Sequence, residues 1–534
     1  MTSTVDHADA PSSDRPAPPP EWRPRHNPWL ITFSVMLATF MEVLDTSVAN
    51  VALPHIAGSL SATPEEATWV LTSYLVSNAI VLPAAAWLGA LFGRKRFLLT
   101  CIVLFTLASA LCGAAPSLSF LVGARILQGV GGGALQPIAQ AVLLESFPPA
   151  RRGMAMAAFG MGVVVAPILG PTLGGWVTEN YTWRWVFYIN LPVGVLAVLM
   201  ANAFVEDPPF IRQARPGRID YVGFGLMALG LAALQLMLDR GQEDDWFAAV
   251  WIRWCAGIAG LSLLAFIVRE LRVAHPIVDL RILRNRNFAV GTTLITILGM
   301  ILYCTIAMLP LFLQILLGYS ALLSGMAMTP RGLGALCTNL VVGRLIGILD
   351  SRILIAGGLT LLGVSGFMFS QMTLQIAMPN VVWANVLNGV ATAMIFVSLA
   401  TQTMGTLRNE QLGNATGIFN LMRNLGGSLG IAAMTTFLAR WTQVHRAVLV
   451  SHLTPYDPAY QRWQALARAG LTARVGEAAA GPKTLALLNR TLDQQAQLLA
   501  FLDIFRVASF LSLAALPLVL LFTRAQGGRG PAAH

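Results

Sequence analysis

The sequence is short of charged residues, and it lacks the motifs of nucleotide-driven and metal-dependent proteins. Asp, Glu, Lys and Arg make up 11% of the 534 residues, whereas soluble globular proteins carry about 25%. No Walker A sequence occurs, so ATP is unsupported as a direct energy source. The five cysteines show no C-x-x-C spacing, which argues against a disulfide framework and a zinc site. Hydrophobic residues reach 56% instead, which predicts an integral membrane protein.

Long apolar runs recur along the whole chain. A helix needs about 20 apolar residues to cross about 30 Å of hydrocarbon. We find about fourteen such windows and expect an all-α membrane protein. The windows lie near residues 29–53, 69–91, 97–115, 118–144, 154–177, 184–204, 219–238, 249–268, 288–316, 324–348, 353–371, 380–402, 412–439 and 499–523.

The net charge of +10 follows the topology of these predicted spans. Basic residues precede the first span and follow the second, fourth, sixth, eighth and last spans, whereas connections such as 54–68 contain no Lys or Arg. This positive-inside asymmetry predicts that both termini are cytoplasmic. The tail 1–28 is expected to be disordered and is no signal peptide, and 524–534 forms a second tail. The basic excess thus marks topology and implies no nucleic-acid partner.

The sequence contains an internal repeat. A shift of 260 residues lays Arg125–Val130 over Asn385–Val390, and a nearly equal shift lays Pro54 over Pro310. Two related six-span halves are typical of transporters that bind substrate between the halves. We therefore expect a 6+2+6 layout of about fourteen spans. Its parts are a first bundle at 29–204, a linker with two extra spans at 205–287, and a second bundle at 288–523.

One predicted span, Gly160–Trp176, contains five glycines and two prolines. In water this composition would break a helix, but in a bilayer neighbouring helices pack against the glycine faces. The order Gly170-Pro171-x-x-Gly174-Gly175 resembles the antiporter signature of major facilitator exporters. A kinked packing helix with no role in the direction of transport is the alternative. The residues of this motif are Gly160, Pro167, Gly170, Pro171, Gly174 and Gly175.

The run Trp183–Gly194 is very similar to a hallmark of the fourteen-span EmrB/QacA-type drug–proton antiporters, and Leu238–Gln242 and His275–Arg281 agree with it. The chain is identified as a member of that family over nearly all of residues 29–523. The resemblance implies a major facilitator fold in the bacterial cytoplasmic membrane and export of hydrophobic or amphipathic drugs in exchange for protons. It implies no enzyme activity and no cofactor beside the proton gradient. A periplasmic adaptor protein is an expected partner if the host has an outer membrane.

Two carboxylates lie deep in the first predicted span. Glu42 and Asp45 are three residues apart, which puts them on one face of a helix. A carboxyl group in a low-dielectric environment beside a second carboxyl holds a proton readily, so this pair is a candidate proton carrier. Asp45 occupies the acidic position of the family's first-span motif, whereas Glu42 is less fixed by the resemblance. For either residue, permanent pairing with an arginine is the alternative.

Arg125 is the expected cation of this site. The sequence Arg125-x-x-Gln128-Gly129 resembles the family's fourth-span motif, whose arginine is thought to govern proton traffic. In the second half, Asn385 takes the place of Arg125, and about Ile301 takes the place of Asp45. Proton exchange is therefore predicted to belong to the first half.

Other polar residues within the spans give weaker signals. They are expected either to line a substrate cavity or to form hydrogen bonds between helices. The candidates are Asn50, Gln128, Gln136, Tyr303, Gln314 and Asn388. The loop after the second span departs from the family, because Ala90 stands where an aspartate usually precedes Gly93-Arg94-Lys95. The usual salt bridge of that aspartate cannot form here.

Residues 441–498 form a large segment outside the predicted spans, and by topology they face outward. Parts of the segment are expected to be helical. It either covers the exit or meets a partner, or it is a passive connector.

Three alternatives to a drug exporter remain at this point. The first is a dedicated exporter of one endogenous metabolite, siderophore or lipid. The second is a membrane sensor or scaffold that transports nothing, which loss of Asp45 and Arg125 would have favoured. Uptake by symport is the third, and the motif at Gly160–Trp176 disfavours it.

Overall fold

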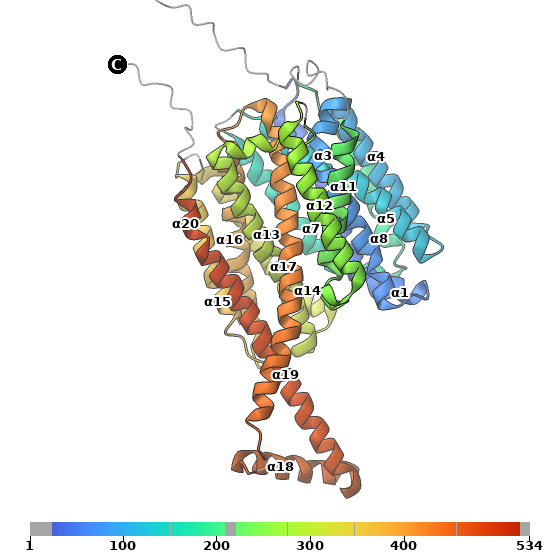
Figure 1. Ribbon diagram of the computed structural model, residues 1–534, viewed down its shortest axis with the longest axis vertical. Helices are drawn as coiled ribbons and strands as arrows, with labels where there is room; N and C mark the ends of the chain where they lie inside the picture. Colours follow the sequence, from blue (N-terminus) through green and yellow to red (C-terminus); the bar gives the residue numbers. More distant parts are fainter. Residues whose placement is uncertain are drawn as a thin grey trace, which may run out of the picture.

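The computed structural model describes residues 24–148, 151–208, 220–274, 276–346, 348–454 and 456–523, and all regular structure in these residues is helical. The predicted tail 524–534 and most of the predicted tail 1–28 lie outside the described residues. The helices form one elongated bundle, from one end of which a narrow helical stalk projects (Figure 1).

The helices α1 to α9 are called the first bundle, and those from α13 onward the second bundle. Most helices of the first bundle are long, and several begin at recognisable sequence signals. The side chain of Asn27 accepts a hydrogen bond from the Trp29 N–H and Pro28 opens α1, and Ser117 caps α5 in a similar way. The elements are α1 (Pro28–Ser59), α2 (Pro64–Ala67), α3 (Trp69–Phe92), α4 (Arg94–Gly113), α5 (Leu118–Gly132), α6 (Leu135–Ser146), α7 (Arg152–Asn180), α8 (Trp185–Tyr188) and α9 (Asn190–Phe204).

Two helices of the predicted linker, α11 (Tyr221–Arg240) and α12 (Val250–Arg272), pack against each other. The helix α11 also contacts α3 of the first bundle and α17 of the second. The turns η2 (Trp246–Ala248) and η3 (Leu280–Arg284) flank α12. The inserted pair therefore lies along the junction of the two bundles.

The second bundle contains the remaining helices. They are α13 (Arg286–Leu311) with the π-helical turn η4 (Phe312–Leu316), α14 (Ala321–Leu345), α15 (Ser351–Phe369), α16 (Met378–Met404), α17 (Asn409–Ser451), α18 (Pro458–Val475), α19 (Glu477–Ala514) and α20 (Leu516–Val519).

Twelve helices of the described residues are long and apolar enough to cross a membrane. The helices α14 and α17, which coincide with spans predicted near 324–348 and 412–439, are not among the twelve. Both nevertheless pack within the bundle, α14 against α7 and α16, and α17 against α13. Buried polar residues such as Arg331 and Arg423 lower their hydropathy. Fourteen spans thus remains a prediction.

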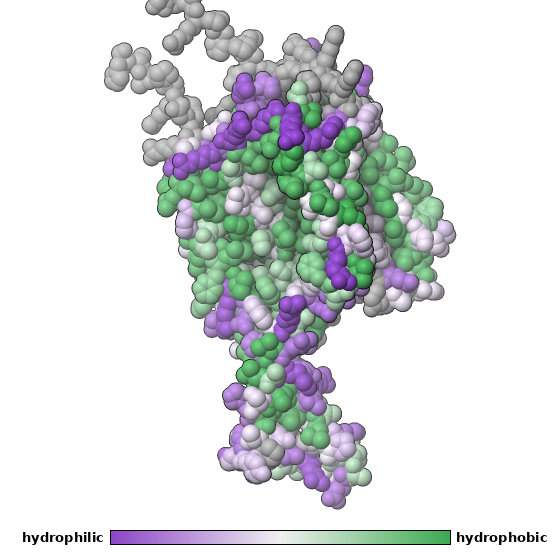
Figure 2. All heavy atoms as spheres, in the orientation of Figure 1, coloured by the Kyte–Doolittle hydropathy of each residue, from purple (hydrophilic) through white to green (hydrophobic). Residues whose placement is uncertain are grey.

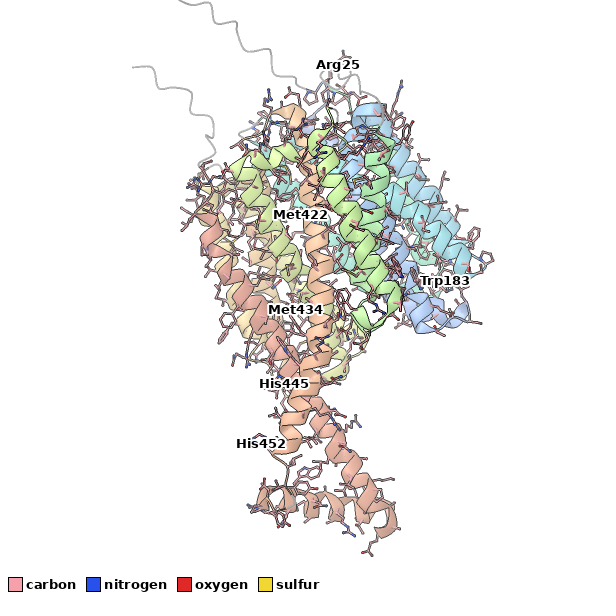
Figure 3. All side chains as sticks on the ribbon, viewed as in Figure 1. Arg25, Trp183, Met422, Met434, His445 and His452 are labelled. Atoms are coloured by element: carbon pink, nitrogen blue, oxygen red, sulfur yellow. The ribbon has the colours of Figure 1, made fainter. Side chains whose placement is uncertain are left out.

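Apolar side chains cover most of the bundle on the face that Figure 2 shows. Leu199, Leu261 and Phe510, from three different helices, are 62%, 73% and 71% exposed. A water-soluble monomer rarely exposes so much contiguous apolar surface. Hydrophilic residues gather instead at the end near Arg25 and on the stalk (Figures 2 and 3). The chain is therefore a multi-pass membrane protein.

The stalk is built from the ends of α17 and α19, with α18 lying across their tips (Figure 1). Figure 3 follows α17 from Met422 and Met434 in the bundle to His445 and His452 toward the stalk. Side-chain pairs join the two long helices, with His445 Nε2 2.7 Å from Asp503 Oδ2 and Arg446 Nε 2.7 Å from Asp493 Oδ1. The predicted segment 441–498 is thus a mainly helical projection at the end of the molecule opposite Arg25.

Glycines set the closest helix crossings, and they do so in the same way in both bundles. A Cβ at Gly129 of α5 would collide with Ser77 and the carbonyl oxygen of Tyr74 on α3. A Cβ at Gly389 of α16 would overlap the carbonyl oxygen of Arg331 on α14. The α14–α16 pair therefore repeats the α3–α5 pair.

Candidate functional site

Asp45 and Arg125 form a fully buried ion pair between α1 and α5. The Nη1 of Arg125 donates to Oδ2 of Asp45 at 2.6 Å, and its Nε donates to the Val70 carbonyl at 3.0 Å. The Oδ1 of Asp45 accepts from Gln128 at 2.8 Å and from Asn190 at 2.6 Å. The structure thus brings together the predicted acid and the predicted cation.

Glu42 lies one helical turn before Asp45, and its hydrogen bonds come from neutral side chains. Its Oε1 accepts from the Tyr74 hydroxyl at 3.1 Å and from Asn78 at 3.4 Å, and its Oε2 accepts from Gln136 at 2.7 Å. The guanidinium of Arg125 stacks over the Tyr74 ring, 4.3 Å from its centroid. Tyr74 therefore contacts Glu42 through its hydroxyl and the Asp45–Arg125 pair through its ring.

Polar contacts continue from this site into the second bundle. Arg423 of α17 donates through Nη2 to the Oε1 of Gln136, and the amide nitrogen of Gln136 donates to Glu42. One turn away, Asn420 donates to Gln140 at 2.7 Å. A chain of side chains thus runs from Glu42 across the interface to Arg423.

The two bundles also meet at the end that carries the basic loop after α3. Arg94 forms an ion pair with Glu145 at the end of α6, and its Nη2 lies 2.8 Å from where a Cβ of Gly413 would be. The Lys95 N–H donates to Asp207 at 2.8 Å. Arg94 thus has a carboxylate partner although Ala90 supplies none.

The glycine-rich motif of α7 contacts both bundles. Gly170 and Gly174 leave room for Ser47 and Val48 of α1, whereas Gly160 faces Asn339 of α14. Gly175 has open space in front of it. Pro167 lies within the same helix, and the side chain of Pro171 is outside the described part of the chain.

The six weaker candidates differ in their surroundings. Gln128 and Gln136 belong to the polar network described above. Asn388 is buried, and its Oδ1 has no hydrogen-bond partner among the described residues. The others lie away from that network: Tyr303 packs against Gly427, and Asn50 and Gln314 are exposed.

Four contributors escaped the prediction from sequence. Tyr74 and Asn190 resemble ordinary span residues until the fold places them beside Glu42 and Asp45. Glu145 is an acidic residue at a span end that could have been paired with the basic loop. Arg331 is a charged residue inside a predicted span, which is itself a signal of function. Among the described residues, no group of three or more His, Cys, Asp or Glu side chains could hold a metal ion.

Comparison with known proteins gives consistent results. The Major Facilitator Superfamily model matches residues 35–431. The chain is 37% identical over 493 residues to the fatty acid resistance protein FarB of Neisseria gonorrhoeae, covering 92% of this chain and 95% of that protein. It is 38% identical over 431 residues to the multidrug export protein EmrB of Escherichia coli strain K12, covering 80% and 84%.

A solved structure shares the fold. The human organic anion transporter MFSD10 (TETRAN) aligns with a TM-score of 0.58 over 91% of this chain and 100% of that chain. At 13% sequence identity the likeness concerns the fold alone.

Proposed function

The chain belongs to the major facilitator superfamily, and on that premise we propose that it is a proton-coupled exporter of hydrophobic and amphipathic compounds. The predicted resemblance to EmrB-type exporters is confirmed by the identity to EmrB and FarB over most of the chain. The coupling to protons, the range of substrates and the outward direction of transport are what we propose for this chain.

The observation that carries the proposal is the buried pair of Asp45 and Arg125 beside Glu42. Glu42, Asp45 and Arg125 together carry one negative charge in excess when all three are ionised, because the next guanidinium, that of Arg423, contacts Gln136 and neither carboxylate. Buried net charge is costly in a membrane, and uptake of one proton removes it. The cluster can therefore alternate between a protonated and a deprotonated state.

Alternating access converts this titration into export. We propose that Asp45 is protonated from outside and releases its proton inside, with Glu42 and Arg125 adjusting its affinity. Proton and substrate then stabilise different states, so inward proton flow drives outward substrate flow. Each charge that crosses the membrane contributes about 2.3 kcal/mol per 100 mV.

The orientation follows from charge. The end with Arg94 and Arg152 is proposed to face the cytoplasm of a bacterial cell, with both termini there and the stalk outside. In a host with an outer membrane, the stalk is the proposed docking element for a periplasmic adaptor. A passive connector is the competing role.

Inverted membrane vesicles that contain the full chain test this function. With an acidified lumen, we expect uptake of several hydrophobic dyes that stops when nigericin collapses the proton gradient. Vesicles with Asp45→Asn serve as the matched control. Uptake that persists after collapse, or that Asp45→Asn leaves unchanged, would overturn proton coupling at this site.

Dedicated export of one amphipathic compound is the second candidate, which the name of the relative FarB as a fatty acid resistance protein favours. Uptake of a single compound from the same panel would support it. A membrane sensor without transport predicts no uptake of any compound.

A further inference from the structure

Among the described residues, no carboxylate pairs with Arg331, a buried arginine of the second bundle. Arg331 lies in the middle of α14 and is 9% exposed. Its Nη1 and Nη2 are buried and have no hydrogen-bond partner among the described residues. An unpaired charge in this position is costly, so a ligand that pairs with it binds favourably.

The internal repeat shows which residue Arg331 replaces. The glycines of α5 and α16 rest on the carbonyl oxygens of Tyr74 and Arg331, respectively. One turn earlier, Arg125 donates to the Val70 carbonyl in the first bundle, and Asn385 donates to the Ala327 carbonyl at 3.1 Å in the second. Arg331 is therefore the counterpart of Tyr74.

The carboxylates of the first bundle have no counterparts in the second. Tyr74 donates to Glu42, and the repeat that lays Pro54 over Pro310 puts Leu298 at the position of Glu42. Between residues 288 and 440, the acidic residues are Asp350 and Glu410, each beside the start of a helix. The second bundle thus keeps a buried cation and replaces its carboxylate by an apolar side chain.

Arg331 also lies near the level of the glycine-rich motif. The helices α7 and α14 run antiparallel, since Gly153 contacts Ile346, Ala157 lies near Gly343, and Gly160 faces Asn339. Continued for about two turns, this register puts Arg331 level with Pro167. The cation is therefore placed at the depth of the first proline of the motif, between Gly162 and Gly170 of α7.

We propose that Arg331 binds the anionic head group, in particular the carboxylate, of an amphipathic substrate. The planar guanidinium matches a carboxylate with two parallel hydrogen bonds. The apolar residue at the Glu42-equivalent position leaves the negative charge to be supplied by the ligand. This inference rests on the proposed export function and specifies one substrate class for it: carboxylates on a hydrophobic tail.

Equilibrium binding to the purified full chain in detergent tests the proposal without any proton gradient. The probes are radiolabelled dodecanoate and, with the same tail but no charge, dodecanol. We expect Arg331→Gln to weaken dodecanoate binding by about tenfold or more and to change dodecanol binding by less than about twofold. The affinity of Arg331→Lys for dodecanoate should lie between those of the unmodified chain and Arg331→Gln, because lysine keeps the charge but cannot form two parallel hydrogen bonds with a carboxylate.

Two further measurements separate binding from folding. Arg344→Gln removes an exposed arginine of the same helix and should leave dodecanoate binding unchanged. Arg331→Met should melt no lower than the unmodified chain, because it removes a buried charge that has no partner to lose. Equal weakening of both probes, or unchanged dodecanoate binding in Arg331→Gln, would overturn the proposal. Absence of proton-driven uptake in vesicles would overturn the export function and leave this binding result standing.

Discussion

At the scale of single residues, Asp45 is held more rigidly than a carboxylate that simply faces a cavity. It receives hydrogen bonds from Arg125, Gln128 and Asn190. A carboxylate has about four acceptor positions, so one position remains for a proton, on the oxygen that Arg125 contacts. We expect a proton bound there to weaken the ion pair that links α1 to α5, and this would couple protonation to a conformational change.

Asp45→Asn tests that coupling. The amide keeps the size of the side chain and can still accept from Gln128, but it cannot ionise. We expect folded protein that shows no proton-driven export and releases no proton when substrate is added to the purified chain. Proton release is measured with a pH-sensitive dye in weak buffer.

Asp493→Asn is the matched control for this substitution, because Asp493 pairs with Arg446 in the stalk, away from the cluster. It should retain both export and proton release. Proton-dependent export by Asp45→Asn would move the coupling site elsewhere, with Glu42 as the first residue to test.

The sequence predicted the members of the site better than their contacts. Charged residues within spans are rare, which singled out Asp45 and Glu42, and the resemblance to the family's fourth-span motif supplied Arg125 as the cation. Tyr74 and Asn190 could not, because aromatic and amide residues occur in many spans without a shared role. The position of Tyr74 depends on which helices cross at Gly129, and that of Asn190 on where α9, which begins at Asn190, packs in the bundle. Both are properties of the tertiary structure.

At the scale of elements, the crosspiece of the stalk is separable from the bundle. The helix α18 packs on α19, and the ion pairs between α17 and α19 lie outside α18. Replacing residues 453–476 by a short Gly-Ser loop should therefore leave expression and the size-exclusion profile unchanged. Transport in inverted vesicles should also be retained.

Resistance of intact cells gives the decisive comparison for this deletion. Loss of resistance with retained vesicle transport would support docking of a partner on the stalk. Retained resistance would contradict docking and favour a passive connector. Loss of folding would show that α18 stabilises the bundle, against the expectation from its contacts.

The inserted helix pair is joined near the basic end by Asp220, which caps α11 and pairs with Arg269 of α12. Its Oδ1 accepts from the Gly223 N–H at 2.8 Å, and Arg269 Nη2 donates to the same oxygen at 2.8 Å. The side-chain hydrogen bonds from Arg269 hold the pKa of Asp220 below its ordinary value. Because the folded-state pKa is lowered, this stabilisation is present above the unfolded pKa and is lost as the pH falls through the folded pKa.

Asp220→Asn should therefore destabilise the protein by up to about 1 kcal/mol at pH 7, mainly because Arg269 loses its charged partner, since Asn caps a helix about as well as Asp. The difference from the unmodified chain should shrink as the pH falls below the ordinary aspartate pKa of about 3.9. Thermal unfolding in detergent at several pH values measures this, with the exposed Asp244→Asn as the control. A difference that stays constant across this pH range would contradict the assignment.

At the scale of the whole molecule, the repeat in the sequence anticipated the two related bundles, but it could not assign their separate roles. The backbone crossings at Gly129 and Gly389 are shared, whereas the charges that lie beside them are not. The first bundle pairs Arg125 with Asp45, and the second leaves Arg331 without a carboxylate. The glycine crossings that set the packing are therefore repeated in both bundles, whereas the buried charges differ, as the proposed division of proton exchange and substrate binding between the bundles requires.

The described contacts between the bundles include a set at the end with Arg94, and alternating access requires this set to separate. A Cβ at Gly413 of α17 would lie 3.6 Å from the Cβ of Ala86 of α3. This falls within the range of about 3.5–4.5 Å that disulfides require. Ala86→Cys with Gly413→Cys, in a chain whose exposed Cys337 is replaced by Ser, should therefore form a disulfide between the halves.

We expect the oxidised double variant to lose nearly all substrate uptake in inverted vesicles and to regain it after reduction, because substrate enters from the end that the disulfide holds shut. The two single-cysteine variants, treated with the same oxidant, should retain transport, with the guanidinium end of Arg94 shifting away from the Cβ at position 413. They thereby exclude damage by the oxidant or by either substitution. A disulfide verified by mass spectrometry that leaves uptake unchanged would show that the contacts near Arg94 need not open. Alternating access would then have to proceed without separation of α3 from α17.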